Sequence, residues 1–290
     1  MSSASLYGRT ATLLMTVRDD NRMVSSPYTK LVNSIIRVDQ GAALVLTTVG
    51  RARDLGMTPD RWVYVLGGGD GEDVWYLTER PGYSASSAMA RVADQAWRSS
   101  GLGVDDVAHF DLYSCFPSAV QLAMGAYGVA EDDPRPMTVT GGLPYAGGPG
   151  NNYTTHSTAA MVEKLREDPG EVGLVTGLGW HVTRHSAGLY GSRPPERPFA
   201  LVDPGPDRVA VESEPHPVIE AEPSGRATVE GYSVAYDREG GPETARCLAR
   251  LDAGRRSLVT SDDPTVAAAM TDGEWYGREI EVTPDLRFRT

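Results

Sequence analysis

The alternation of strand-like and helix-like segments between residues 61 and 180 constrains this fold more than any other feature. Apolar strand-like runs alternate with segments that space apolar residues at helical intervals, the runs at 61–67, 107–116 and 171–180 and the helical segments at 86–100, 117–128 and 157–168. Ser86 or Ser87 suits the N-cap of the first helix, Gly101 suits its end, and Pro117 suits the first turn of the second. This alternation is typical of an α/β fold in which helices flank a sheet.

Two stretches outside this region extend the prediction. The apolar run at 42–48 resembles a buried strand and leads into a short basic helix that ends at Gly56. The proline-rich stretch SRPPERP, at 192–198, is typical of a stiff linker. Beyond it, short β-rich pieces, of which RVAVESE is the first, are separated by Gly, Asp and Pro, and with one short helix at 263–271 they predict a small β-barrel.

Composition disfavours several classes of partner. The net charge is −12, and residues 196–290 carry −8 of it, so the chain repels a nucleic-acid backbone. No apolar run approaches the roughly 20 residues that span a bilayer, and the N-terminal residues lack a secretory pattern, so we expect a cytoplasmic protein without a membrane span. Cys115 and Cys247 lie far apart without metal-ligand spacing, and we expect both to be reduced thiols.

The glycine-rich stretch GGLPYAGGPGNNYTTHS, at 141–157, leads into the last predicted helix. A phosphate-binding P-loop ends in Gly-Lys-Ser/Thr, which is absent here, and no Gly-x-Gly-x-x-Gly follows a strand. These absences disfavour a nucleotide site. A glycine-rich entrance to a helix still offers free backbone N–H groups to an anion, including a thioester oxygen that gains charge.

Three side chains are candidates for catalysis, each with a structural alternative. Cys115 lies where a predicted strand meets a helix, which suits a nucleophile, although a small buried hydrophobic residue explains the position as well. His156 and His185 are candidates for a base, and the alternative is a hydrogen-bonded structural histidine. His181 and His185 are four residues apart, but the segment is predicted as strand and loop without an HExxH glutamate, so we expect no metal.

Four motifs, in this order, resemble the later half of the thiolase superfamily, in particular its sterol-carrier-protein-like branch and the thiolase-like proteins of type 1. NRMVSSPYTKLVNSIIRVDQGAALVL resembles the segment in which a proline-containing strip precedes an aspartate and a Gly-Ala-Ala strand. FDLYSCFPSAVQLA resembles the strand and helix that carry the HDCF or NEAF motif. VTGGLPYAGGPGNN resembles the stretch in which Gly-Gly precedes a Gly-His-Pro, and GLVTGLGW resembles the late strand that carries a Cys-x-Gly. The resemblance covers residues from about 19 to 195.

The resemblance implies a thiolase-like layered α-β-α sheet, incomplete because its amino-terminal half is missing, followed by a small oligonucleotide-binding-like β-barrel. It implies a remnant of the amino-terminal and loop region at 1–74, a carboxyl-terminal-like domain at 75–191 and the additional barrel at 196–290. The strand at 42–48 would then lack its neighbours. A partner chain or a longer parent protein would supply the missing half.

Departures from the family's motifs bear on activity. Tyr113 stands where HDCF has its histidine, Gly148 where Gly-His-Pro has its histidine, and 177–179 is Gly-Leu-Gly where Cys-x-Gly is expected. The nucleophilic cysteine of thiolases belongs to the half that is missing. Thiolysis needs a thiolate, a base and oxyanion donors. The resemblance therefore implies an acetyl-CoA acetyltransferase-like protein of lipid metabolism that binds acyl-CoA without the usual catalytic residues.

Two alternatives stay open. One is an active C-acyltransferase or retro-aldol enzyme, alone or in a split complex, in which Tyr113 acts as acid or oxyanion donor, Cys115 as acyl carrier, and His156 or His185 takes a new role. The other is an interaction scaffold. We expect no bound cofactor and no metal, with a coenzyme A thioester as substrate or ligand. The candidate residues for binding it are Gly147, Gly148, Asn151 and Lys30.

Overall fold

The computed structural model describes residues 11–290 and divides them into two compact units. Residues 34–75 and 82–213 form the first, which we call the α/β unit. The second, which we call the barrel unit, contains residues 11–33, 76–81 and 214–290. Each unit has its own hydrophobic core. The three-part division expected from the sequence stays a prediction.

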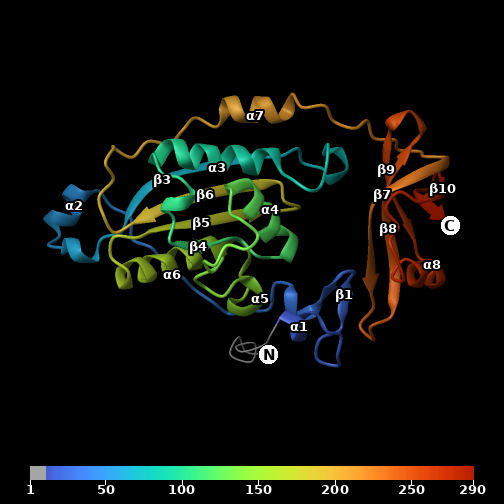
Figure 1. Ribbon diagram of the computed structural model, residues 1–290, viewed down its shortest axis with the longest axis horizontal. Helices are drawn as coiled ribbons and strands as arrows, with labels where there is room; N and C mark the ends of the chain where they lie inside the picture. Colours follow the sequence, from blue (N-terminus) through green and yellow to red (C-terminus); the bar gives the residue numbers. More distant parts are fainter. Residues whose placement is uncertain (1–10) are drawn as a thin grey trace. The chain divides into compact units, whose positions relative to one another are not determined.

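A four-stranded sheet forms the centre of the α/β unit (Figure 1). Its strands are β3 (Tyr64–Glu72), β4 (His109–Asp111), β5 (Val172–Gly179) and β6 (Arg184–Gly191), in the order β3-β6-β5-β4. β4 and β5 run parallel, with Phe110 opposite Leu174, whereas β6 is antiparallel to both β3 and β5. The carboxyl ends of β4 and β5 therefore lie at the same end of the sheet, together with the hairpin that joins β5 to β6.

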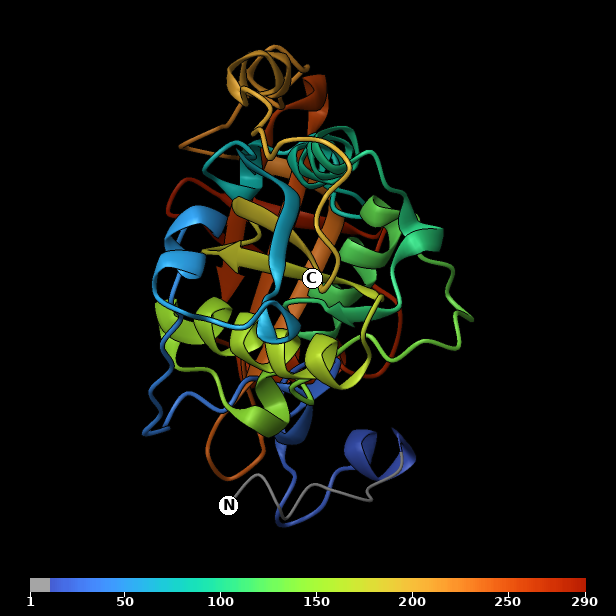
Figure 2. The same cartoon turned by 90° about the vertical axis from the view of Figure 1, so that its left-hand side faces the viewer.

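Helices cover both faces of this sheet (Figures 1 and 2). α3 (Ser87–Ser100) and α4 (Pro117–Tyr127) pack on one face, and α6 (Tyr153–Glu167) packs on the other. Successive strand residues point to opposite faces. Accordingly, Leu174 of β5 joins the core beneath α3 and α4, while Val175 joins the core beneath α6. The predicted mixed α/β fold is confirmed for this unit.

Local signals at the helix ends are confirmed. Ser86 Oγ accepts a hydrogen bond from the Met89 N–H at 3.0 Å, and Gly101 ends α3 in the left-handed conformation, with φ of +76°. Pro117 occupies the first turn of α4. The remaining helical elements of the unit are α2 (Val49–Asp54), α5 (Leu143–Ala146), α7 (Gly205–Glu212) and 3-10 turns at Pro59–Arg61, Val104–Asp106 and Gly150–Asn152.

The strand predicted at 42–48 is wrong. These residues form no regular element, and Val45 and Leu46 are 88% and 74% exposed. Ile36, on the same connection, is 81% exposed. An apolar run becomes a strand where packing and a paired neighbour support it. Residues 42–48 pair with no strand among the described residues, so the run stays irregular.

Other strand boundaries also differ from prediction. β3 begins at Tyr64 and continues through the glycine and acid cluster to Glu72, because it pairs with β6 along that whole length. The glycines allow α3 to approach the strand: a Cβ at Gly69 would lie 2.8 Å from the Cβ of Gln95. β4 occupies only the centre of the predicted 107–116 run.

The segment RVAVESE, predicted as a strand, lies largely in helix α7 instead. Val211 is 3% exposed, so it supplies the apolar contact of this helix. Asp207, in the first turn, accepts a hydrogen bond from the side-chain amide of Gln95 on α3 at 2.8 Å. Docking on α3 thus overrides the β-propensity of the valines.

The barrel unit contains a closed five-stranded β-barrel. Its strands are β7 (Gly225–Tyr236), β8 (Pro242–Leu251), β9 (Arg256–Ser261), β10 (Glu279–Thr283) and β11 (Arg287–Arg289). They follow the order β7-β8-β9-β11-β10, and β10 pairs back onto β7 to close the ring. The predicted barrel is confirmed, as is its short helix, α8 (Pro264–Ala269). Its likeness to oligonucleotide-binding barrels stays a prediction.

The described N-terminal residues add short elements to this unit, where mainly irregular structure was expected. They are α1 (Ala11–Met15), β1 (Met23–Ser25), β2 (Tyr28–Thr29) and a 3-10 turn at Lys30–Val32, with further turns at Leu77–Glu79 and Asp252–Gly254. β1 pairs with β7, where Ser25 lies opposite Ala235. Across residues 11–290, no helix combines the length and the apolar character needed to cross a bilayer.

Candidate functional site

The connection from β4 to α4 carries Tyr113, Ser114 and Cys115. Tyr113 is fixed to β5 because its backbone N–H donates to Thr176 Oγ1 at 2.9 Å. Ser114 Oγ accepts a hydrogen bond from the Leu143 N–H at 3.1 Å. The YSCF motif therefore meets the glycine-rich stretch in space.

Residues 34–36 run beside both segments. The Ser34 N–H donates to the Cys115 carbonyl at 3.1 Å, and the Ile35 N–H donates to the Leu143 carbonyl at 3.2 Å. The Ile35 carbonyl in turn accepts from the Gly148 N–H at 2.8 Å. Three stretches that are far apart in sequence thus form one hydrogen-bonded group. We call residues 34–36, 113–115 and 141–150 the three-segment junction.

Two kinds of constraint explain the glycines of the junction. Gly142 and Gly147 have φ of +80° and +99°, a region that residues with side chains rarely adopt. Gly148 lies outside that region but is tightly packed: a Cβ there would overlap Ser34 Oγ and lie 3.3 Å from Leu143 Cδ2. At Gly148, close packing against side chains, rather than backbone conformation, therefore explains the glycine.

A buried carboxylate holds the residues that lead into the glycine-rich part of the junction. Asp111, at the end of β4, is fully buried, and its Oδ2 accepts hydrogen bonds from the backbone N–H of Val139 and Thr140, both at 3.0 Å. The hydroxyls of Thr138 and Thr140 donate to the same oxygen, and Tyr153 donates to Oδ1 at 3.0 Å. A buried charge needs such donors. Asp111 thereby fastens the start of the glycine-rich stretch to β4 and α6.

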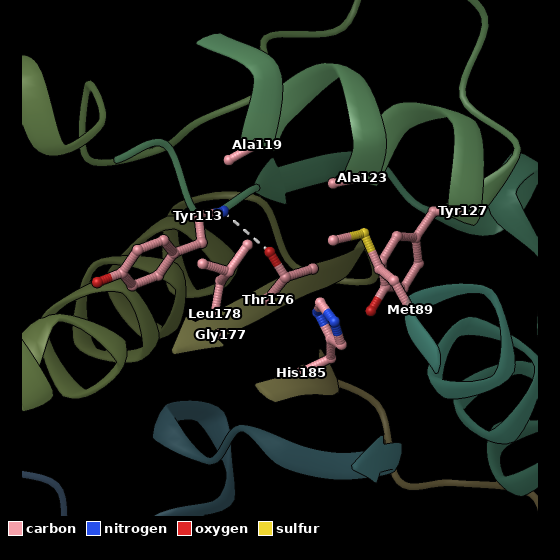
Figure 3. Close-up of a pocket in the computed structure, with 9 residues that line it drawn as sticks. All are labelled: Met89, Tyr113, Ala119, Ala123, Tyr127, Thr176, Gly177, Leu178 and His185. Carbon is pink, nitrogen blue, oxygen red and sulfur yellow. Dashed lines mark hydrogen bonds between the residues drawn. The ribbon is translucent and has the colours of Figure 1, made fainter. Parts of the chain in front are cut away.

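A small pocket lies between the sheet and helices α3 and α4, at the carboxyl end of β5 (Figure 3). It has room for about one water molecule. Burial raises the pKa of Tyr127, so the phenol at this pocket stays protonated. The lining residues come from five segments and are Met89, Tyr113, Ala119, Ala123, Tyr127, Thr176, Gly177, Leu178 and His185.

His185 reaches this pocket from β6 and is only 4% exposed. Its Nε2 lies 3.2 Å from Asp73 Oδ2 and 3.3 Å from Ser86 Oγ, and the Ser86 hydroxyl also bonds the Asp73 carboxylate. A carboxylate only accepts hydrogen bonds, so this contact assigns the ring proton to Nε2 and leaves Nδ1 as an acceptor. Nδ1 has no hydrogen-bond partner among residues 11–290.

The partners of His185 also have structural tasks. Ser86 is the N-cap of α3, and the Asp73 N–H donates to the Thr183 carbonyl at 2.8 Å. The cluster therefore joins the end of β3, the start of α3 and β6. This arrangement is not a nucleophilic triad, because Ser86 and Asp73 face the same ring nitrogen. The chemistry that the arrangement can provide is acceptance of a proton, by Nδ1 of His185, from a group bound in the pocket.

The environment of Cys115 does not favour a thiolate. Burial raises the pKa of its thiol, although hydrogen bonds from the backbone N–H of Phe116 and of Cys115 itself act the other way. Burial also raises the pKa of Tyr113, and the nearby Cys115 adds to that shift. Both groups are therefore protonated at neutral pH. Cys247 is fully buried in the barrel core, where burial raises its pKa to about 12.

The remaining candidates are distributed over the chain. His156 lies in the first turn of α6, with its Nε2 3.1 Å from the Asn152 side-chain amide, and it does not line the pocket. Asn151 is exposed in the turn before α6, and Lys30 is exposed in the barrel unit. The structure thus brings Tyr113 and His185 to one pocket, and Cys115 and the glycines to one junction.

Sequence reasoning did not assign Asp73, Asp111 or Thr176 to the site. Asp73 stands at the end of an acid cluster that is typical of a loop, and only the pairing of β3 with β6 brings it to His185. Asp111 follows a strand-like run, which was the one available signal. In the described part of the chain, no group of three or more His, Cys, Asp or Glu is placed to hold a metal ion.

Comparisons with known proteins agree with this architecture. The family model of the thiolase-like protein type 1 additional C-terminal domain matches residues 208–287. Among solved structures, a monomeric SCP2-thiolase-like protein type 1 from Mycobacterium smegmatis is 37% identical, with a TM-score of 0.89 over 97% of this chain. The chain spans 62% of the length of that protein. No curated protein matches it.

The chain combines a mixed α/β unit with a five-stranded barrel, and residues from the resembling motifs meet at the carboxyl end of β4 and β5. These features define the thiolase-like class of architecture. Over almost its whole length the chain is similar to an SCP2-thiolase-like protein of type 1, and residues 208–287 match the additional C-terminal domain of that type. The resemblance inferred from the sequence motifs is confirmed.

Proposed function

We propose that this protein binds an acyl-CoA with its thioester at the three-segment junction and does not carry out thiolysis by itself. The observation that carries the proposal is the packing at Gly148, where side-chain atoms of Ser34 and Leu143 lie within 3.3 Å of the position that a Cβ would take. The protonated state of Cys115 and Tyr113 supports it further. The junction offers a shaped surface, whereas it lacks a ready base or thiolate.

The pocket beside Tyr113 supports a short acyl group. Ala119, Ala123 and Leu178 give it apolar walls, and room for one water molecule is comparable to room for one methyl group. We therefore propose acetyl-CoA as the first ligand to test, and a cytoplasmic setting in lipid metabolism as its context. The exposed Asn151 is the proposed contact on this unit, whereas Gly147 and Gly148 are buried and pack against Gln40 and Ser34.

Calorimetric titration of the full chain with acetyl-CoA tests the proposal. We expect saturable binding, no acetyl mass adduct, and slower iodoacetamide labelling of Cys115 when acetyl-CoA is bound. Cys247 is 0% exposed and serves as the internal control for labelling. A folded chain that does not bind acetyl-CoA contradicts the proposal. An acetyl adduct that Cys115→Ser abolishes would instead favour the enzyme alternative.

One observation favours that alternative. Asp73 orients His185, whose second ring nitrogen is an acceptor beside the pocket. In an active enzyme, His185 would remove a proton from the α-carbon of a bound acetyl group. Incubation of acetyl-CoA with the protein in D2O measures this step. Deuterium uptake that is lost in His185→Gln but kept in the control His109→Gln, which changes a histidine outside the pocket, supports the enzyme, and no uptake in the wild type contradicts it.

The exposed apolar connection favours a polypeptide partner. Ile36, Val45 and Leu46 are each at least 74% exposed, and large exposed apolar side chains on one connection are typical of an interaction surface. We propose that a partner segment covers residues 36–46, so that the protein acts as part of a complex or as a scaffold. Light scattering tests this: Val45→Asp with Leu46→Asp should reduce self-association and dye binding. A monodisperse wild type that binds no apolar dye contradicts the proposal.

A further inference from the structure

Three planar side chains lie together at the hairpin between β5 and β6. The Arg184 guanidinium lies over the Trp75 ring, 5.7 Å from its centroid, and the rings of Trp75 and Trp180 are 5.5 Å apart with an interplanar angle of 52°. Trp180 ends the row and is 70% exposed, while Trp75 is 44% exposed. Tryptophan normally buries most of its large apolar surface. An indole this open at the end of a stack therefore has a ring face available to a ligand.

The backbone holds this stack in a strained conformation. Trp180 and Val182 have φ of +57° and +58°, in the left-handed region that bulky residues rarely adopt. The hydrogen bond from the Asp73 N–H to the Thr183 carbonyl ties the segment before Trp75 to the hairpin. Strain of this kind persists where the surroundings enforce it, and it concentrates at ligand-binding positions.

The hairpin lies at the functional end of the sheet. Trp180 follows Leu178 of the pocket by two residues, and the parallel strands β4 and β5 place Cys115 at the same end. A ligand that has one end at the three-segment junction can therefore extend toward Trp180. Glu72 forms an ion pair with Arg184 at 3.3 Å, which keeps the guanidinium over Trp75.

We propose that the exposed face of Trp180 stacks on the adenine base of coenzyme A, an inference that rests on the proposed function. The free face of Trp180 can hold one more planar π-system beside the guanidinium and the two indoles. Adenine is the planar group that an acyl-CoA carries. Base stacking on aromatic side chains needs no sequence-specific hydrogen bonds. Trp180 thereby distinguishes CoA thioesters from thioesters of pantetheine alone.

Calorimetric titration with CoA and with pantetheine, which lacks the nucleotide, tests this inference in the full chain. A base stacked on an aromatic ring typically changes affinity by about 5- to 150-fold. We expect Trp180→Ala to weaken CoA binding within that range and to change pantetheine binding by less than about twofold. Alanine keeps the same left-handed backbone demand, and near-ultraviolet circular dichroism checks that the pocket is unchanged. Trp180→Phe should retain part of the CoA affinity because a smaller ring still stacks.

A matched control is Tyr276→Ala, which removes another aromatic residue that is 68% exposed but lies in the barrel unit. It should leave both affinities unchanged. CoA binding that Trp180→Ala does not weaken, or an equal loss for CoA and pantetheine, overturns the stacking inference while the proposed function stands. A folded wild type that binds neither compound overturns the proposed function and this inference with it.

Discussion

A methyl group at position 148 tests whether the three-segment junction is as tightly packed as its contacts indicate. A Cβ there would overlap Ser34 Oγ and would lie 3.3 Å from Leu143 Cδ2 and 3.4 Å from Ser34 Cβ. The hydroxyl can rotate away, but the contacts with Leu143 Cδ2 and Ser34 Cβ then remain. Overpacking a filled site costs about 1–3 kcal/mol. Since one contact is relieved by rotation, we expect Gly148→Ala to lower the free energy of unfolding by about 1–2 kcal/mol.

Urea unfolding followed by circular dichroism measures this effect, with the m-value checked for constancy. Ser34→Ala removes the overlapping hydroxyl, so the double variant should recover about 1 kcal/mol relative to the sum of the single changes. Gly125→Ala is the matched control, because Gly125 lies inside α4 with nothing within 4 Å of a built Cβ. In a helix interior this change stabilises by about 0.5–1 kcal/mol. A neutral Gly148→Ala, or strict additivity with Ser34→Ala, would refute the tight packing inferred here.

Three further outcomes follow from the structure. Because burial raises the pKa of Cys115, its thiolate forms only at higher pH than in an unfolded chain, so iodoacetamide labelling at pH 7.5 should be slower in the native protein than in guanidinium. Asp111→Asn should lower the free energy of unfolding by about 2–4 kcal/mol, since the amide faces several donors that the carboxylate now satisfies, and thermal unfolding measures it. In the barrel unit, Arg256→Leu leaves the carbonyls of Thr78 and Arg80 without this donor and leaves Glu230 with Arg250 alone, and should cost about 2–4 kcal/mol. The exposed Arg250→Ala should cost less than about 1 kcal/mol in the same assay.

Elements with strong local signals could be predicted from the sequence. The two ends of α3 depend on the Ser86 cap and on glycine at 101, which are both determined within a few residues of the chain. Burial alternates along β8 and β10, and turn residues separate the strands, so a β-rich barrel could be inferred, although RVAVESE is largely helical and β11 was not predicted. These features need no knowledge of what the segments contact.

Elements whose state depends on distant partners could not be predicted. The run at 42–48 has the composition of a strand but no strand partner among the described residues, so its apolar side chains stay exposed. Glycines in the cluster after Leu66 suggested a loop, yet the long antiparallel pairing with β6 makes them strand. The pairing of β3 with β6 joins residues more than 100 positions apart in sequence, and the run at 42–48 lacks any such partner among the described residues. Neither fact can be inferred from the local sequence.

The site shows the same division. Tyr113, Cys115 and His185 could each be selected from sequence because tyrosine, cysteine and histidine carry reactive groups in motif-like surroundings. Their grouping could not, since it depends on the parallel register of β4 with β5 and on the contact between Asp73 and His185. Sequence identified the chemistry of single residues, and the fold decided which of them share a pocket.

The bonding of the junction explains how motif resemblance and altered chemistry can coexist. Of the four hydrogen bonds described between its segments, three join backbone groups, and only Ser114 contributes a side chain. Backbone bonds do not depend on the side chains at 113 or 148. Residues at those two positions can therefore change while the junction keeps its shape, provided that the new side chain fits.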